Sequence, residues 1–140
     1  MPRADTLTLT VTEVLDESPE ARSLVFEVPA DAPERLAYRP GQFLTLRVPS
    51  TRTGSVARCY SLASSPYTDS APKVTIKRTE GGYASNWLCD NVSPGDRIEV
   101  LPPAGVFTPQ DLDEQPLLTY SIIGPYTAGS LTRITNDQIL

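Results

Sequence analysis

Hydrophobic and polar residues alternate in a series of short runs along the chain. The clearest run lies near the start, where Leu7, Leu9 and Val11 are separated by threonines. A period of two residues is typical of a β-strand with one buried face. Further alternating or apolar runs follow at residues 24–28, 44–48, 56–63, 74–76 and 98–100. The pattern therefore predicts a chain built mostly of short strands.

Proline and glycine fill the gaps between these runs, which predicts tight turns between the strands. Regularly spaced short strands favour an all-β barrel or sandwich. One helix is also predicted: Ser85 is its expected N-cap, and Ser-Pro-Gly at 93–95 ends it. The residues that follow helical spacing in this segment are Trp87, Leu88, Asn91 and Val92.

Composition removes several kinds of chemistry. The chain of 140 residues has no histidine, which excludes a Ser-His-Asp triad, a Cys-His dyad and a His-ligated zinc site. Two cysteines cannot supply the four thiolates of an iron–sulfur cluster, so no metal site is predicted. We expect Cys59 and Cys89 to be small buried packing residues rather than redox groups. Any chemistry should then come from a bound cofactor.

Charge is distributed unevenly. The net charge of −5 argues against nucleic acid as a partner, yet residues 35–78 carry eight basic residues and one acid, Asp69. Such a basic centre suits a compact anionic ligand such as a pyrophosphate, although arginines on exposed strand faces explain it equally well on charge alone. No apolar stretch approaches the roughly 20 residues of a membrane span, and no secretory signal is visible. No membrane association and a cytoplasmic location are expected.

Several motifs together carry a resemblance to a known family. They are residues 39–43 (Arg-Pro-Gly-Gln-Phe), 58–66 (Arg-Cys-Tyr-Ser-Leu-Ala-Ser-Ser-Pro), 74–78 (Val-Thr-Ile-Lys-Arg), 82–88 (Gly-Tyr-Ala-Ser-Asn-Trp-Leu) and 103–107 (Pro-Ala-Gly-Val-Phe). In this order they resemble the flavin-binding domain of the ferredoxin–NADP reductase superfamily, and most of all the reductases of bacterial 3-ketosteroid 9α-hydroxylases. The resemblance implies a six-stranded antiparallel Greek-key barrel with one short capping helix, over residues 1–118.

The run 58–61 is the centre of the implied site. Arg58 presents a planar fork of donors suited to phosphate oxygens, and the resemblance assigns it to the pyrophosphate of FAD. Tyr60 shares the strand face of Arg58 and is implied to stack on the isoalloxazine ring. Ser61 is implied to lie near flavin N5, so Tyr60 and Ser61 are the candidate catalytic residues. In an ideal strand Ser61 points the other way, and a local bend is needed to aim both side chains at one ring.

A second phosphate contact is expected at the helix start. Unpaired N–H groups there suit an anion, Gly82 allows close approach, and the Ser85 hydroxyl can add a bond, although Ser85 serves equally well as a simple N-cap. The resemblance further implies that Ile76 and Lys77 line the polar edge and ribityl chain of the flavin.

The implied function is an FAD-binding electron-transfer domain of an NAD(P)H-dependent oxygenase reductase, with an oxygenase or iron–sulfur protein as acceptor. FAD is preferred over FMN. Residues 119–140 are predicted to be a divergent tail without a Gly-x-Gly nucleotide-binding turn, so another domain or chain must supply the NAD(P)H site. The tail could also form a homodimer contact or be the end of a truncated gene. The alternative is a truncated flavin-binding or interaction module without reductase turnover.

Overall fold

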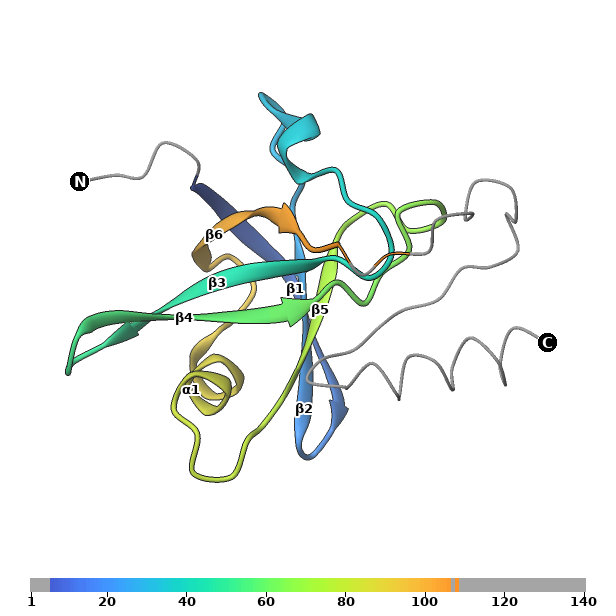
Figure 1. Ribbon diagram of the computed structural model, residues 1–140. Helices are drawn as coiled ribbons and strands as arrows, with labels where there is room; N and C mark the ends of the chain where they lie inside the picture. The colour runs from blue at the N-terminus through green and yellow to red at the C-terminus, as the bar shows by residue number, and fades with distance from the viewer. Residues whose placement is uncertain (1–5, 107, 109–140) are drawn as a thin grey trace.

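The structure is a computed structural model, and it describes residues 6–106 and residue 108 (Figure 1). Within these residues the chain forms an antiparallel sheet, one α-helix and a short 3-10 helix. The strands are β1 (Leu7–Ser18), β2 (Ala21–Phe26), β3 (Phe43–Ser50), β4 (Gly54–Ser61), β5 (Lys73–Lys77) and β6 (Arg97–Ala104). The helices are η1 (Pro33–Leu36) and α1 (Ala84–Asn91). Each alternating run predicted from the sequence overlaps a strand, and residues 27–28 and 62–63 of two runs lie beyond the strand ends.

The sheet has the order β4-β3-β6-β1-β2-β5, and all its strand pairs are antiparallel. An antiparallel bridge between Leu62 and Val74 joins the two ends of this order. Beside it, the Ala63 N–H donates to the Lys73 carbonyl at 2.7 Å. The sheet therefore curls until its edges meet at one end, which confirms the predicted six-stranded Greek-key barrel.

The core lies on the inward face of the curled sheet. Leu44, Leu46 and Val48 alternate along β3 and are fully buried. Leu24 and Phe26 of β2 are fully buried in the same cluster. Burying a side chain of this size contributes about 1.5–3 kcal/mol, so the period-two pattern determines which face of each strand turns inward.

The helix α1 packs its buried residues, among them Leu88 and Cys89, onto the core and contacts β3, β4 and β5 (Figure 1). The prediction that Ser85 caps this helix is wrong. Tyr83 is the N-cap residue, without a side-chain cap, and Ser85 lies inside the first turn. The reason is a competing donor: the Ser85 hydroxyl accepts the backbone N–H of Thr79 at 3.0 Å. The helix ends before residues 93–95, as predicted.

The two cysteines differ in their surroundings. Cys89 is buried, as expected, but Cys59 is exposed, so that part of the prediction is wrong. Cys59 pairs with Thr45 across β3 and β4, and the Thr45 hydroxyl lies 3.3 Å from its sulfur on the outward face of the sheet. An edge strand leaves this face open to solvent, which the alternation alone did not reveal.

No helix among the described residues is long and apolar enough to cross a membrane. The predicted tail, residues 119–140, lies outside the described residues.

Candidate functional site

Arg58 and Tyr60 lie on the inward face of β4, which is the edge strand of the sheet. Arg58 is opposite Leu46 and Tyr60 is opposite Leu44, and paired residues of antiparallel strands point to the same side. The leucines are fully buried, Tyr60 is half-buried against the core, and Arg58 is exposed. The prediction that Arg58 and Tyr60 share a face is therefore confirmed.

Most N–H donors of the Arg58 guanidinium form no hydrogen bond within the described chain. Its one hydrogen bond within the described chain runs from Nη1 to the neighbouring Ala57 carbonyl, at 2.8 Å. No carboxylate among the described residues forms an ion pair with it. Three other arginines do have such partners, in the pairs Arg22–Asp16, Arg47–Glu99 and Arg78–Asp90. The arrangement leaves the Arg58 fork available to an anion from outside the described chain.

Tyr60 offers one side of an aromatic ring next to this cation. Burial raises the pKa of its hydroxyl above the ordinary value, and nearby Cys89 raises it further, while Arg58 lowers it. The phenol therefore stays protonated at neutral pH and remains a neutral surface for stacking. Tyr60 packs against the core cluster that contains Leu88 and Cys89 of α1.

Ser61 lies on the opposite face of β4 from Tyr60. It pairs with Phe43, and the register of β3 with β4 is unbroken from Ser50–Gly54 to this pair. The strand thus contains no bulge that turns Ser61 toward the face of Tyr60. The Ser61 hydroxyl forms no hydrogen bond within the part of the chain that the structure describes.

Backbone groups of β4 and β5 turn toward each other where these strands diverge. The Leu62 N–H donates to the Gln42 carbonyl at 2.9 Å. In an antiparallel pair only alternate residues form backbone hydrogen bonds with the neighbouring strand. The backbone groups of the intervening residues Cys59 and Ser61 therefore point to the outer edge of β4. Likewise, the Arg78 N–H donates to the carbonyl of Glu20, the residue just before β2. The backbone groups of the neighbouring Lys77 therefore point away from β2. We call these facing edges, residues 57–61 and 75–77, the seam.

The predicted β5 residues behave differently from one another. Ile76 is fully buried in the core and its backbone is directed at Arg22 of β2, whereas Lys77 is exposed and its backbone is directed at the seam. The helix α1 contacts both β4 and β5 and thus lies against the seam. Its start is tied to β3 by a hydrogen bond from the Tyr83 hydroxyl to the Pro49 carbonyl.

The turn before α1 is closely packed. Gly82 donates its N–H to the Thr79 carbonyl at 2.8 Å, and a Cβ added to Gly82 would lie 3.0 Å from Thr79 Cβ. A larger residue would crowd Thr79 here, so glycine lets the turn close tightly. Ser85 is buried and holds Thr79, as described above, but its hydroxyl hydrogen is still available to an acceptor.

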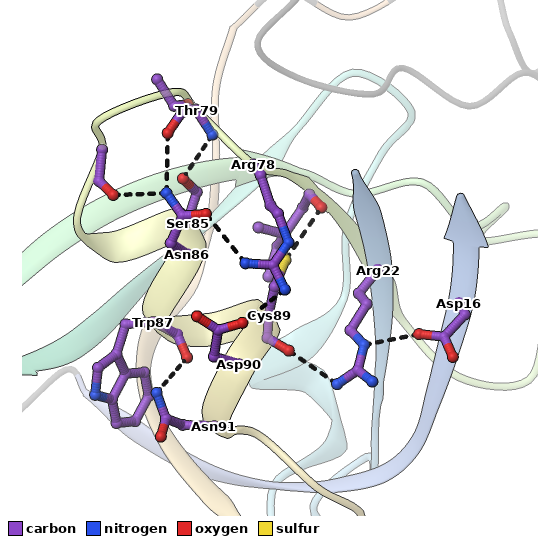
Figure 2. Close-up of polar contacts among 12 residues, drawn as sticks. Asp16, Arg22, Arg78, Thr79, Ser85, Asn86, Trp87, Cys89, Asp90 and Asn91 are labelled. Carbon is purple, nitrogen blue, oxygen red and sulfur yellow. Dashed lines mark hydrogen bonds and ion pairs between the residues drawn. The ribbon is translucent and has the colours of Figure 1, made fainter. Parts of the chain in front are cut away.

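Sequence reasoning missed two residues that organise this turn. Arg78 and Asn86 hydrogen-bond each other, and Asn86 also bonds back to Thr79 (Figure 2). In the sequence these are an arginine and an asparagine eight residues apart. That spacing is not typical of contacts within a helix or a strand, so it did not indicate that they interact.

Residues 8–108 match the model of a protein family described as the oxidoreductase FAD-binding domain. The chain belongs to this family. FAD is therefore its cofactor, and the predicted likeness to ferredoxin reductases is confirmed. The donor set fits this ligand. A guanidinium that has no carboxylate partner among residues 6–106 and 108, together with a helix start, suits a diphosphate. A tyrosine ring beside open strand edges suits a flat, polar-edged ring.

Two curated relatives of this FAD-binding domain are similar over most of the chain. The ferredoxin reductase component of the 3-ketosteroid-9-alpha-monooxygenase of Rhodococcus rhodochrous is 67% identical over 110 residues, which are 79% of this chain and 31% of the relative. The corresponding component of Mycobacterium tuberculosis is 65% identical, over 80% of this chain and 33% of the relative. The chain thus spans about a third of the length of these relatives.

A solved structure shares the fold as well. The cytochrome P450 reductase of Amycolatopsis is 34% identical, with a TM-score of 0.63 over 80% of this chain and 32% of that one. The chain is thus an FAD-binding domain of the type found in oxygenase reductases.

Proposed function

We propose that this chain binds FAD across the seam and acts as the flavin module of an NAD(P)H-dependent oxygenase reductase. The identity of 67% with a 3-ketosteroid monooxygenase reductase component supports this role. The observation that carries the proposal is the pairing of Arg58, a cation without a carboxylate partner among the described residues, with the half-buried Tyr60 on one face of an edge strand.

Arg58 binds the diphosphate of FAD in this proposal. Its planar fork donates two parallel hydrogen bonds to phosphate oxygens and compensates their charge. Gly82 and Ser85 supply the second contact, through the N–H groups at the start of α1 and the remaining hydroxyl hydrogen of Ser85. Arg58 and the start of α1 are two separate contacts for phosphate. Two contacts suit the diphosphate of FAD better than the single phosphate of FMN.

Tyr60 and Ser61 orient the flavin ring. A ring that lies across the outer edge of β4, rather than flat on one face, meets Tyr60 from one side of the strand and Ser61 from the other. This placement removes the need for a bend. The Ser61 hydroxyl would then donate a hydrogen bond at flavin N5, and the backbone of Lys77 would face the ring's polar edge.

When bound, FAD accepts an electron pair from a reduced nicotinamide and releases the electrons singly to an acceptor. The chain's own part is to hold and orient the ring. The proposed acceptor is an iron–sulfur centre that serves an oxygenase, and the proposed location is the cytoplasm. Another domain or chain supplies the site for NAD(P)H. A homodimer contact through residues 119–140 stays a prediction.

The test is a titration of the purified chain with FAD, followed by flavin absorbance and fluorescence. One FAD should bind per chain, and the bound flavin should bleach fully with dithionite but slowly with NADH under anaerobic conditions. A chain that takes up no FAD would contradict the flavin role. Rapid, saturable reduction by NADH would contradict the proposal that the donor site lies elsewhere.

A further inference from the structure

The side-chain amide of Asn86 holds the turn that precedes α1. Its Nδ2 donates to the Thr79 carbonyl at 2.9 Å and to the Gly82 carbonyl at 2.7 Å. Its Oδ1 accepts from Arg78 Nη1 at 3.1 Å. Figure 2 shows this amide between the turn and Arg78. One amide therefore uses both of its N–H donors and an acceptor to connect the turn with β5.

Arg78 fixes which way this amide points. Its Nη2 donates to Asp90 Oδ1 at 2.7 Å, one helical turn beyond Asn86, and its backbone N–H donates to Glu20 at 2.7 Å. A guanidinium carries only N–H donors, so Arg78 can offer Asn86 only a donor. The amide oxygen must face Arg78, and the amide nitrogen must face the carbonyls of the turn.

Two carbonyl oxygens of the turn, those of Thr79 and Gly82, accept hydrogen bonds. Thr79 O accepts from both Gly82 N–H and Asn86 Nδ2, and Gly82 O accepts from Asn86 Nδ2. Carbonyl oxygens that faced an anion would repel it, whereas the N–H groups of the first helical turn attract it. Those N–H groups have no carbonyl four residues earlier inside the helix.

We infer that Asn86 is the positioning residue for the phosphate-binding end of α1. It draws the Thr79 and Gly82 carbonyls toward its own amide and so leaves an N–H surface for the diphosphate. This inference rests on the proposed FAD site, and it concerns the phosphates rather than the flavin ring. Loss of the Asn86 amide should therefore lower the affinity for ligands that carry a diphosphate and leave the affinity for a ligand without phosphate unchanged.

The test compares FAD with riboflavin, which lacks phosphate, on the flavin-free chain and on Asn86→Ala. The wild-type chain should bind FAD more tightly than riboflavin. In Asn86→Ala this preference should fall by about tenfold, which is about 1.4 kcal/mol or roughly the value of one ordinary hydrogen bond, with riboflavin affinity unchanged. Backbone amide hydrogen exchange in residues 79–85 of the flavin-free variant should become faster.

Asn91→Ala is the matched control. Asn91 also donates to the carbonyl four residues earlier, that of Trp87 at 2.9 Å, but at the far end of the same helix. It should keep the full preference for FAD. If Asn86→Ala does not fold, Asn86→Ser, whose hydroxyl can bond one carbonyl only, replaces it in the same comparison.

The outcomes separate the two proposals. An unchanged FAD-to-riboflavin preference in Asn86→Ala, with Arg58→Ala losing it, would overturn the inference and leave the FAD site intact. Equal loss of FAD and riboflavin affinity would show a general structural role and overturn the inference too. A wild-type chain without any preference for FAD would overturn the proposed phosphate site and the inference together.

Discussion

Arg58 lies directly opposite Leu46 across β3 and β4, so a charged side chain and a fully buried one occupy the same face of the sheet. Arg58 escapes burial because β4 is an edge strand. An exposed guanidinium that has no carboxylate partner in the described chain is free to pair with a bound phosphate.

Tyr60→Phe should bind FAD as tightly as the wild-type chain, because the hydroxyl stays protonated at neutral pH and only its ring face is used. Tyr60→Ala should weaken FAD binding by about 1 kcal/mol through loss of stacking. Fluorescence titrations measure both affinities, and urea denaturation of the flavin-free variants measures the lost packing separately. Weakened binding in Tyr60→Phe would point to a role for the hydroxyl instead.

Ser61→Ala should keep the affinity for FAD but slow the reduction of bound flavin by about tenfold or more, because a donor at N5 is lost. Stopped-flow bleaching by excess NADH without oxygen gives the rate. Ser55→Ala is the control, since Ser55 is another half-buried serine of the same strand. Equal rates in Ser61→Ala and the wild-type chain would remove the N5 assignment.

Ser85→Ala should lower the free energy of unfolding of the flavin-free chain by about 1 kcal/mol, because Thr79 N–H loses its acceptor. Chemical denaturation without FAD measures this directly. A hydroxyl that served only the phosphate would leave the stability of the flavin-free chain unchanged, so that result would contradict the role of Ser85 in the turn.

Asp90→Asn should flatten the acid dependence of stability. The hydrogen bond from Arg78 lowers the pKa of Asp90 below its ordinary value of 3.8. The stabilisation is therefore complete above that value and is lost as the pH falls through the lower folded pKa. Urea denaturation at a series of pH values should show a smaller loss in Asp90→Asn than in the wild-type chain. Identical profiles would contradict this contribution.

The strands could be predicted because each one buries a single face, and alternation such as Leu44, Leu46 and Val48 records that burial directly. The shared face of Arg58 and Tyr60 followed from the same period of two. The order of the strands could not be derived locally, because the pairs of β3 with β6 and of β6 with β1 join distant segments. The family resemblance supplied that part.

The helix start was predicted less well, because the competing bonds come from outside the helix. Ser85 is a residue type that favours N-caps, but its hydroxyl accepts the Thr79 N–H instead. The roles of Asn86 and Arg78 depend on a turn whose shape the sequence does not record. Exposure of Cys59 depended on β4 being an edge strand, which again is a property of the whole sheet.

The central claim is that Arg58 holds the diphosphate of FAD, and the most direct measurement is the FAD affinity of Arg58→Ala beside Arg52→Ala. Both changes remove one exposed positive charge, but Arg52 lies in the turn between β3 and β4, outside the seam. Arg58→Ala should weaken binding by about 1.5–3 kcal/mol, the value of a charged hydrogen bond, and Arg52→Ala should leave it nearly unchanged. Equal affinities in Arg58→Ala and the wild-type chain would contradict the claim.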